Sequence, residues 1–167
     1  NEKAAFWWHR QLCAGRRLPV TGGSDYHRPG LLGSLAMPCQ CLYAASRSQT
    51  DLMKALRRGN GYLSYLPTGP QADLLTLSPE GHPASFGEDA APGASVEIFF
   101  SGLCQGDEIR LLTDTAAESL SAPAGAAELK LTRRYPDAHF LRLELYRSYA
   151  PGLPPMKALL TNPVYFR

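Results

Sequence analysis

The spacing of apolar residues predicts a helix at the start of the chain. Over residues 3–14, Ala5, Trp8 and Leu12 recur at the interval that places them on one stripe of a helix. Gly15 follows where such a helix is expected to stop. We therefore expect an amphipathic helix whose apolar stripe packs on the rest of the protein.

Three further elements are expected before residue 60. The apolar run 18–21 predicts a short strand, which leads into a loop rich in Gly and Pro. Residues 39–44 predict a second strand, and the polar segment 48–51 predicts the start of a helix that ends at Gly59. The first part of the chain therefore alternates helix, strand, strand and helix.

From Gly61 onward the pattern changes to short segments of alternating apolar residues, separated by Gly, Pro and Asp. Segments of this kind at this spacing predict an antiparallel, immunoglobulin-like β-sandwich. The expected strands are 62–66, 73–77, 95–100, 108–113, 128–133, 139–146 and 156–160. The stretch 83–93 is expected to be a loop within the sandwich.

The segment 140–146 has the clearest strand pattern. Three leucines alternate there with Arg142 and Glu144, so the leucines share one face of a strand and the two charged residues share the other. We expect the leucine face to belong to the core and the Arg142 face to contact water. Together with the helices, this predicts an α+β protein in two parts, residues 1–60 and residues 61–167.

The composition is that of a folded protein. The chain has 167 residues, 44% of them hydrophobic and 19% charged, which suffices for one sizeable core or two small ones. The net charge of +2 comes from scattered Lys and Arg and gives no electrostatic case for nucleic-acid binding. No segment approaches the roughly 18 apolar residues of a membrane helix. We expect a soluble, cytoplasmic protein whose four cysteines are reduced.

Asp25 and His27 are the candidate metal ligands. In an extended backbone, residues two apart project to the same side, so this pair presents a carboxylate and an imidazole to one point. These ligand types suit Zn, Mn or Fe. Taken alone, the triplet is a weak signal, and it is more typical of an Asx-turn with an exposed histidine in a loop.

The sequence around this pair resembles a known family. Gly23-Ser24-Asp25-Tyr26-His27, preceded by a Trp-containing helix, resembles the closing G-S-D-x-H motif of the PHP (polymerase and histidinol phosphatase) superfamily of hydrolases. The likeness continues through 52–64 and Gly69-Pro70, and the segments 140–145 and 158–165 resemble the last strands of the CehA/McbA-type branch. The resemblance therefore covers nearly the whole chain.

The resemblance implies a fold and a metal-dependent activity. It implies that residues 1–60 are the end of a distorted β/α barrel and that residues 61–167 are an accessory β-sandwich. It also implies metal-assisted hydrolysis, often of phosphate esters, with Asp25 and His27 as ligands of a divalent metal. Arg28 would then be placed to bind a substrate phosphate through paired donors, whereas its other interpretation is an ordinary loop arginine.

The chain departs from the family in what it lacks. Family members take most metal ligands from an early His-x-His motif and other upstream residues, but the only other histidines here are His9, His82 and His139. Because the chain opens on Asn1, we expect a C-terminal fragment of a longer hydrolase. Its expected partner is the N-terminal barrel portion of the same protein, and the fragment alone is expected to be inactive and to bind little or no metal.

Two alternatives remain open. Cys39 and Cys41 would face the same way on a strand, as a metal or redox pair or as small buried apolar residues. The whole chain is alternatively a non-catalytic sandwich module that binds a carbohydrate, a protein or a cell-surface component. Exposed aromatic rings, for example Tyr146 and Tyr149, would favour such a module.

Overall fold

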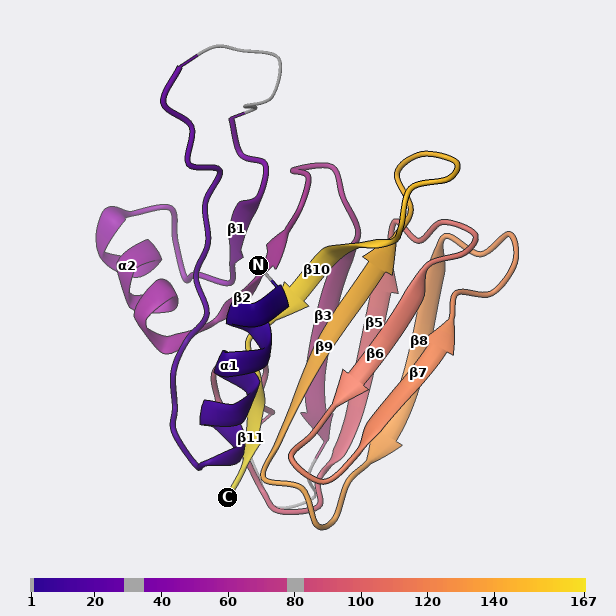
Figure 1. Cartoon of the computed structure of the whole chain (residues 1–167). Coiled ribbons are helices and arrows are strands. Elements are labelled where there is room, and N and C mark those ends of the chain that lie inside the picture. Colours follow the sequence, from indigo (N-terminus) through magenta and orange to yellow (C-terminus); the bar gives the residue numbers. More distant parts are fainter. Residues whose placement is uncertain (1, 29–34, 78–82) are drawn as a thin grey trace.

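A computed structural model describes residues 2–28, 35–77 and 83–167 of the chain. Over these residues the protein is a mixed α+β structure with two helices and strands in two sheets (Figure 1). The helices are α1 (Glu2–Cys13) and α2 (Gln49–Arg58). The strands are β1 (Cys39–Leu42), β2 (Gly61–Ser64), β3 (Gln71–Leu77), β4 (Asp89–Ala90), β5 (Ser95–Ser101), β6 (Glu108–Leu112), β7 (Ala117–Ser121), β8 (Glu128–Arg134), β9 (Phe140–Arg147), β10 (Met156–Thr161) and β11 (Val164–Phe166).

Both predicted helices are present and end as their sequences indicate. The Ser48 hydroxyl accepts a hydrogen bond from the Asp51 amide at the start of α2, and Gly59 ends the helix in the left-handed region at φ 74°. In α1, the predicted stripe faces the protein through Trp8 and Leu12. The Trp8 indole also donates to the Leu18 carbonyl at 2.7 Å, which fixes the chain after the helix.

The larger sheet has eight strands arranged around β9. On one edge of β9 lie β6 and then β7, while on the other edge β10 and β11 pair with successive parts of the strand. From β10 the sheet continues antiparallel through β2 to β1, and β11 pairs in parallel with β4. The arrangement places β9 at the centre of the sheet, where its backbone pairs on both edges.

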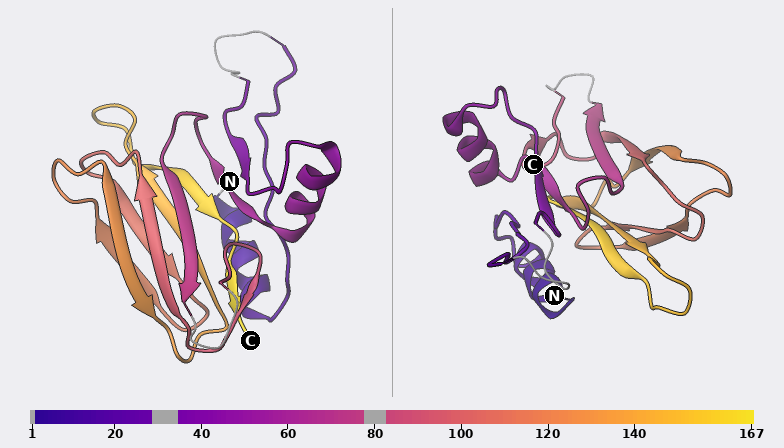
Figure 2. Two further views of the ribbon diagram at one scale, coloured as in Figure 1. Left: turned by 180° about the vertical axis from the view of Figure 1, so that it is seen from behind. Right: turned by 90° about the horizontal axis from the view of Figure 1, so that it is seen from above.

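The smaller sheet, in the order β3-β5-β8, faces the β6, β9 and β10 region of the larger sheet (Figures 1 and 2). The main core fills the space between them with fully buried side chains such as Phe86, Ile98, Phe100 and Leu143. At one side, Arg133 of β8 makes a bidentate contact with Glu118 of β7, so the two sheets are joined at their edges.

The free edge of β3 is largely covered by its neighbours. The Tyr43 hydroxyl donates to the Ala72 carbonyl at 2.6 Å, and the Thr76 amide donates to the Ala84 carbonyl at 2.9 Å. Asp73 uses its own carboxylate to accept the Leu74 amide. Because this strand lies at the end of its sheet, these contacts satisfy backbone groups that a further strand would otherwise pair with.

The expectation that Arg142 and Glu144 contact water is wrong. Both residues are only 3% exposed, and six consecutive residues of β9 are buried. The leucine face of β9 packs toward the smaller sheet, as expected. The opposite face is covered by α1, whose Trp8 ring lies 5.0 Å from the Arg142 guanidinium. Alternation correctly separates two faces of a strand, but it does not reveal that a helix covers the charged one.

All seven predicted sandwich strands have counterparts, but other predictions need correction. Residues 18–21 form no strand; their backbone runs beside the sheet and is bound by a side chain. The loop expected at 83–93 contains β4. Strands β7 and β11 were not predicted, because the sequence AESLS has only one large apolar residue and VYF is only three residues long.

The predicted parts 1–60 and 61–167 are in contact at several places. Strand β1 pairs with β2, which in turn pairs with β10, and helix α1 packs on β9. The division into two parts stays a prediction. Neither helix of the described residues has the length or apolar content that a membrane crossing requires.

Candidate functional site

The predicted ligand pair lies on a long connection between α1 and β1. After α1 the chain passes the edge of the larger sheet and then rises away from the body of the molecule (Figure 1). Gly22 lies so close to this sheet that a Cβ there would be 3.1 Å from two methyl groups of Leu63. Further along the loop, Asp25 and His27 lie in solvent.

The two side chains lie near each other but contact little else. Asp25 is 92% and His27 78% exposed at the side chain, and His27 Nδ1 is 3.7 Å from Asp25 Oδ1. His27 Nδ1 also lies 2.6 Å from the Asp25 main-chain oxygen. A carbonyl oxygen can only accept, so Nδ1 is the donor in this contact and Nε2 is the ring nitrogen left to face a ligand. Metal-binding histidines commonly donate one ring N–H to such an acceptor and bind the metal through the other nitrogen.

Asp25 has an unusual backbone conformation. Its φ of +52° lies in the left-handed region, which Asp and Asn tolerate better than most residues because of their short polar side chains. The Asp25 carbonyl is thereby turned toward the His27 ring, which it contacts. The two residues are close through this local turn, and the extended strand geometry assumed from the sequence is absent at this point.

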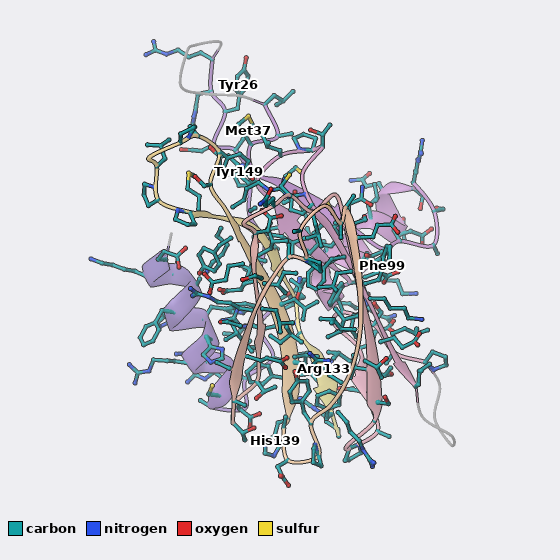
Figure 3. All side chains as sticks on the ribbon, turned by 90° about the vertical axis from the view of Figure 1, so that its right-hand side faces the viewer. Tyr26, Met37, Phe99, Arg133, His139 and Tyr149 are labelled. Atoms are coloured by element: carbon teal, nitrogen blue, oxygen red, sulfur yellow. The ribbon has the colours of Figure 1, made fainter. Side chains whose placement is uncertain are left out.

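The remaining ligands of a metal site are not found beside this pair. Among the described residues, no group of three or more His, Cys, Asp or Glu side chains is arranged to hold a metal ion. His139 binds Asp114 and lies at the opposite end of the molecule from Tyr26, the residue between the two candidate ligands (Figure 3). His82 lies outside the described residues.

His9 packs between α1 and β9, where it contacts Arg142 and Phe140. Its Nδ1 accepts a hydrogen bond from Arg142 at 3.2 Å, and its ring packs edge-on against Phe140. Burial and the neighbouring Arg142 charge lower the pKa of His9 below its usual 6.5. His9 is therefore a neutral packing residue of the helix interface.

Arg28 is exposed directly after His27. Arg28 is adjacent in the sequence to the candidate ligand His27, and its guanidinium donors are open to water. The structure thus keeps Asp25, His27 and Arg28 together at one exposed apex. Their association comes from adjacency in the sequence.

An apolar groove of about 590 Å³ lies below this apex. It runs between α1, residues 20–23 and the strands β2 and β10. Ala5, Trp8, Leu63 and Leu160 contribute to its lining, and Lys157 supplies a charge at its wall. On the outer side of α1, Trp7 is 57% exposed. The groove and the exposed Trp7 are therefore more apolar than the loop that carries Asp25 and His27.

A second polar cluster, which sequence reasoning missed, lies beneath α1. Arg142 donates to Glu144 at 2.6 Å, and Lys157 donates to the same carboxylate at 2.9 Å. Burial alone would raise the pKa of Glu144, but the charges and hydrogen bonds of Arg142 and Lys157 outweigh it and hold this pKa below its usual value. Every charge here has a partner, so the cluster binds α1 to the sheet and leaves no group free for chemistry.

The other candidates have structural surroundings. Cys39 and Cys41 lie partly buried on β1 as free thiols, with Cys39 Sγ 3.6 Å from the Ser64 carbonyl. Burial, with the Cys41 thiol beside it, raises the pKa of Cys39, which disfavours the reactive thiolate. This agrees with small buried residues rather than a redox or metal pair.

The two tyrosines suggested for a binding module are not presented as open rings. The Tyr146 ring lies between the Arg110 guanidinium, at 4.4 Å, and the Lys157 ammonium, at 5.3 Å. Tyr149 packs against the main core and the Tyr65 ring. Neither residue therefore offers the exposed aromatic platform on which a sugar ring would stack.

Comparison of the chain with protein-family models, curated proteins and solved structures gives no match. Function is therefore inferred from the residues and their geometry. Three features bear on it: the exposed pair on the loop, the groove below it and the satisfied cluster beneath α1.

Proposed function

We propose that this chain is the C-terminal part of a PHP-type, metal-dependent hydrolase that acts on small phosphate esters. In this proposal residues 1–60 complete a β/α barrel, and residues 61–167 form an immunoglobulin-like accessory sandwich. Asp25 and His27 supply two ligands of a Zn, Mn or Fe site. The N-terminal barrel portion of the same protein supplies the others.

The observation that supports this most directly is the geometry of the exposed pair. The donor set, one carboxylate and one imidazole nitrogen, fits a divalent metal. The contact from His27 Nδ1 to the Asp25 carbonyl fixes the ring and leaves Nε2 to face a ligand, as second-shell partners do in metal sites. Within the described residues the side chains of Asp25 and His27 form no ion pair except with each other, in contrast to the charges beneath α1.

The same surface explains why the chain alone would not be active. Two protein ligands in open solvent bind a divalent cation weakly, because water competes for the other positions. The groove below the loop and the exposed Trp7 present apolar area that a second body of the protein would cover. Such a body would also bring the missing ligands to the apex.

Each residue at the apex has a distinct part in this proposal. Asp25 and His27 hold the metal, which when bound lowers the pKa of a coordinated water and so supplies the nucleophile. Arg28 binds the substrate phosphate through its paired N–H donors and orients it toward that site. Asp25 also fixes the orientation of the His27 ring through the main-chain contact.

The test uses the protein extended upstream of residue 1. We expect the extended protein to bind divalent metal and hydrolyse a generic phosphomonoester or phosphodiester, and Asp25→Asn to abolish the hydrolysis. Asp137→Asn, in an exposed turn remote from the loop, serves as the matched control and should leave the rate unchanged. Full activity in Asp25→Asn would overturn the ligand assignment.

One observation favours the alternative of a non-catalytic binding module. The outer face of the smaller sheet exposes Leu75, Leu77 and Phe99, and Figure 3 shows Phe99 on the outer side of the sandwich. Such a face suits a protein partner better than a carbohydrate. If the extended protein binds no metal, and Phe99→Asp removes binding to a partner that purifies with it, this alternative replaces the hydrolase.

A further inference from the structure

Asn162 lies at the junction of β10 and β11 and is only 1% exposed. Its side-chain oxygen accepts the Val20 amide at 2.7 Å, and its side-chain nitrogen donates to the Val20 carbonyl at 3.3 Å. An amide side chain thus pairs with both backbone groups of Val20, as a neighbouring strand would. This explains why residues 18–21 lie beside the sheet without forming a strand of it.

The same side chain also reaches the turn between α2 and β2. Asn162 donates to the Gly61 carbonyl from its side-chain nitrogen at 3.2 Å and from its backbone amide at 3.1 Å. Gly59 passes so close that a Cβ there would lie 3.1 Å from the Asn162 carboxamide, and its φ of +74° also favours glycine. Asn162 therefore joins three segments that are far apart in the sequence.

From this geometry we infer that Asn162 is a positioning residue for the candidate metal ligands, through which the sandwich holds their loop in place. This inference rests on the proposed function. Val20 is five residues before Asp25, and Gly22, between them, packs over Leu63 of the sheet. The Val20 contact therefore sets where the loop leaves the body and where its apex lies.

Asparagine is suited to this role for a chemical reason. Only a carboxamide offers an acceptor to the Val20 amide and donors to two carbonyl oxygens from one short side chain. The isosteric carboxylate of Asn162→Asp would face the Val20 and Gly61 carbonyls without a proton, and repulsion would weaken the contact. At acid pH the protonated carboxyl would regain one donor, so the defect should diminish.

The experiment measures amide hydrogen exchange and 15N relaxation on the 167-residue chain. In Asn162→Asp at pH 7 we expect exchange of the Val20 amide to rise at least tenfold relative to core amides such as Ile98. We also expect order parameters to fall over residues 21–27, and both effects to diminish near pH 4. Asn60→Asp is the matched control, because Asn60 also donates to a backbone carbonyl, that of Phe86, but does not contact Val20.

A second variant covers the case in which Asn162→Asp does not fold. Val20→Pro removes the backbone N–H that donates to the Asn162 side chain and leaves Asn162 itself intact. We expect order parameters to fall over residues 21–27 with little change in the core. The inference would be overturned by unchanged exchange of the Val20 amide in Asn162→Asp, by unchanged order parameters over residues 21–27 in Val20→Pro, or by exchange that rises equally in every core amide. These outcomes are independent of hydrolysis, so they are distinguishable from a failure of Asp25→Asn to abolish activity.

Discussion

Two regions of this protein carry similar charged side chains in opposite surroundings. Beneath α1, Arg142 and the half-buried Lys157 both bind the carboxylate of Glu144, which is buried together with Arg142. On the loop, Asp25 and His27 are almost fully exposed and contact only each other. Residue type alone therefore does not indicate function. The hydrogen-bonding capacity of the buried groups is satisfied within the fold, whereas the exposed pair retains its capacity to bind a ligand.

The strongest disruption of the buried region should come from Trp8, which covers its charges. Trp8→Ala removes a side chain that is 5% exposed together with its hydrogen bond to Leu18, and is expected to cost about 3–5 kcal/mol of unfolding free energy. Trp7→Ala, at the neighbouring 57% exposed position, should change it by less than about 0.5 kcal/mol. Urea unfolding followed by circular dichroism measures both. Equal losses would mean that α1 does not pack as described.

Removing one charge from the buried cluster tests the cluster itself. Glu144→Gln leaves Arg142 and Lys157 without their carboxylate, and we expect a loss of about 3 kcal/mol, the lower end of the range for a broken buried pair. Glu97→Gln removes the half-buried partner of the exposed Lys130 and should cost under about 1 kcal/mol. If the two variants are equally stable in urea, the buried charges do not depend on one another.

The pH dependence of stability should come from the buried region and not from the loop. Because the pKa of His9 is lowered in the fold, the unfolded chain takes up its proton first. The stabilisation is therefore complete above pH 6.5 and is lost as pH falls below it. The groups that face His9 are Arg142 and Glu144 on β9, Cys13 on α1 and Asp114 in the β6–β7 turn.

Denaturation at pH 7.5 and pH 5.5 measures this effect. His9→Gln should reduce the stability lost between the two pH values, whereas His27→Gln, in the exposed loop, should not. The interpretation fails if the two variants respond alike.

The smallest effect is expected at the loop. Asp25→Asn should change the free energy of unfolding by less than about 0.5 kcal/mol, because the side chain is exposed and packs against nothing. Addition of Zn²⁺ or Mn²⁺ to the 167-residue chain should raise its melting temperature little, since two ligands bind weakly. Thermal melts with and without metal and chelator measure both. A large metal-dependent stabilisation would mean that further ligands lie nearby.

Much of the fold could be predicted because periodicity is local. The stripe of Trp8 and Leu12, the cap at Ser48 and the alternating leucines of β9 are each visible in a few consecutive residues. The burial of Arg142 could not be predicted in this way, since it depends on a helix more than 130 residues earlier in the chain. Strand β7 was missed because its burial is shallow and its residues are mostly small or polar.

The candidate site divides in the same way. The spacing of Asp25 and His27 indicated that they lie close together, and this is so, although a left-handed turn rather than an extended strand brings them together. For Asn162, by contrast, nothing in the neighbouring sequence indicates that its side chain reaches Val20. Contacts between distant segments carry most of what the sequence did not predict.

The covered edge of β3 has a consequence for behaviour at high concentration. A sandwich with open edge strands can add strands from further molecules and grow into aggregates. Before it could pair with β3, a second molecule would have to displace two contacts. These are the hydrogen bond from the Tyr43 hydroxyl to the Ala72 carbonyl and the one from the Thr76 amide to the Ala84 carbonyl. Removal of the Tyr43 hydroxyl would therefore expose the chain to self-association at this edge without altering its core.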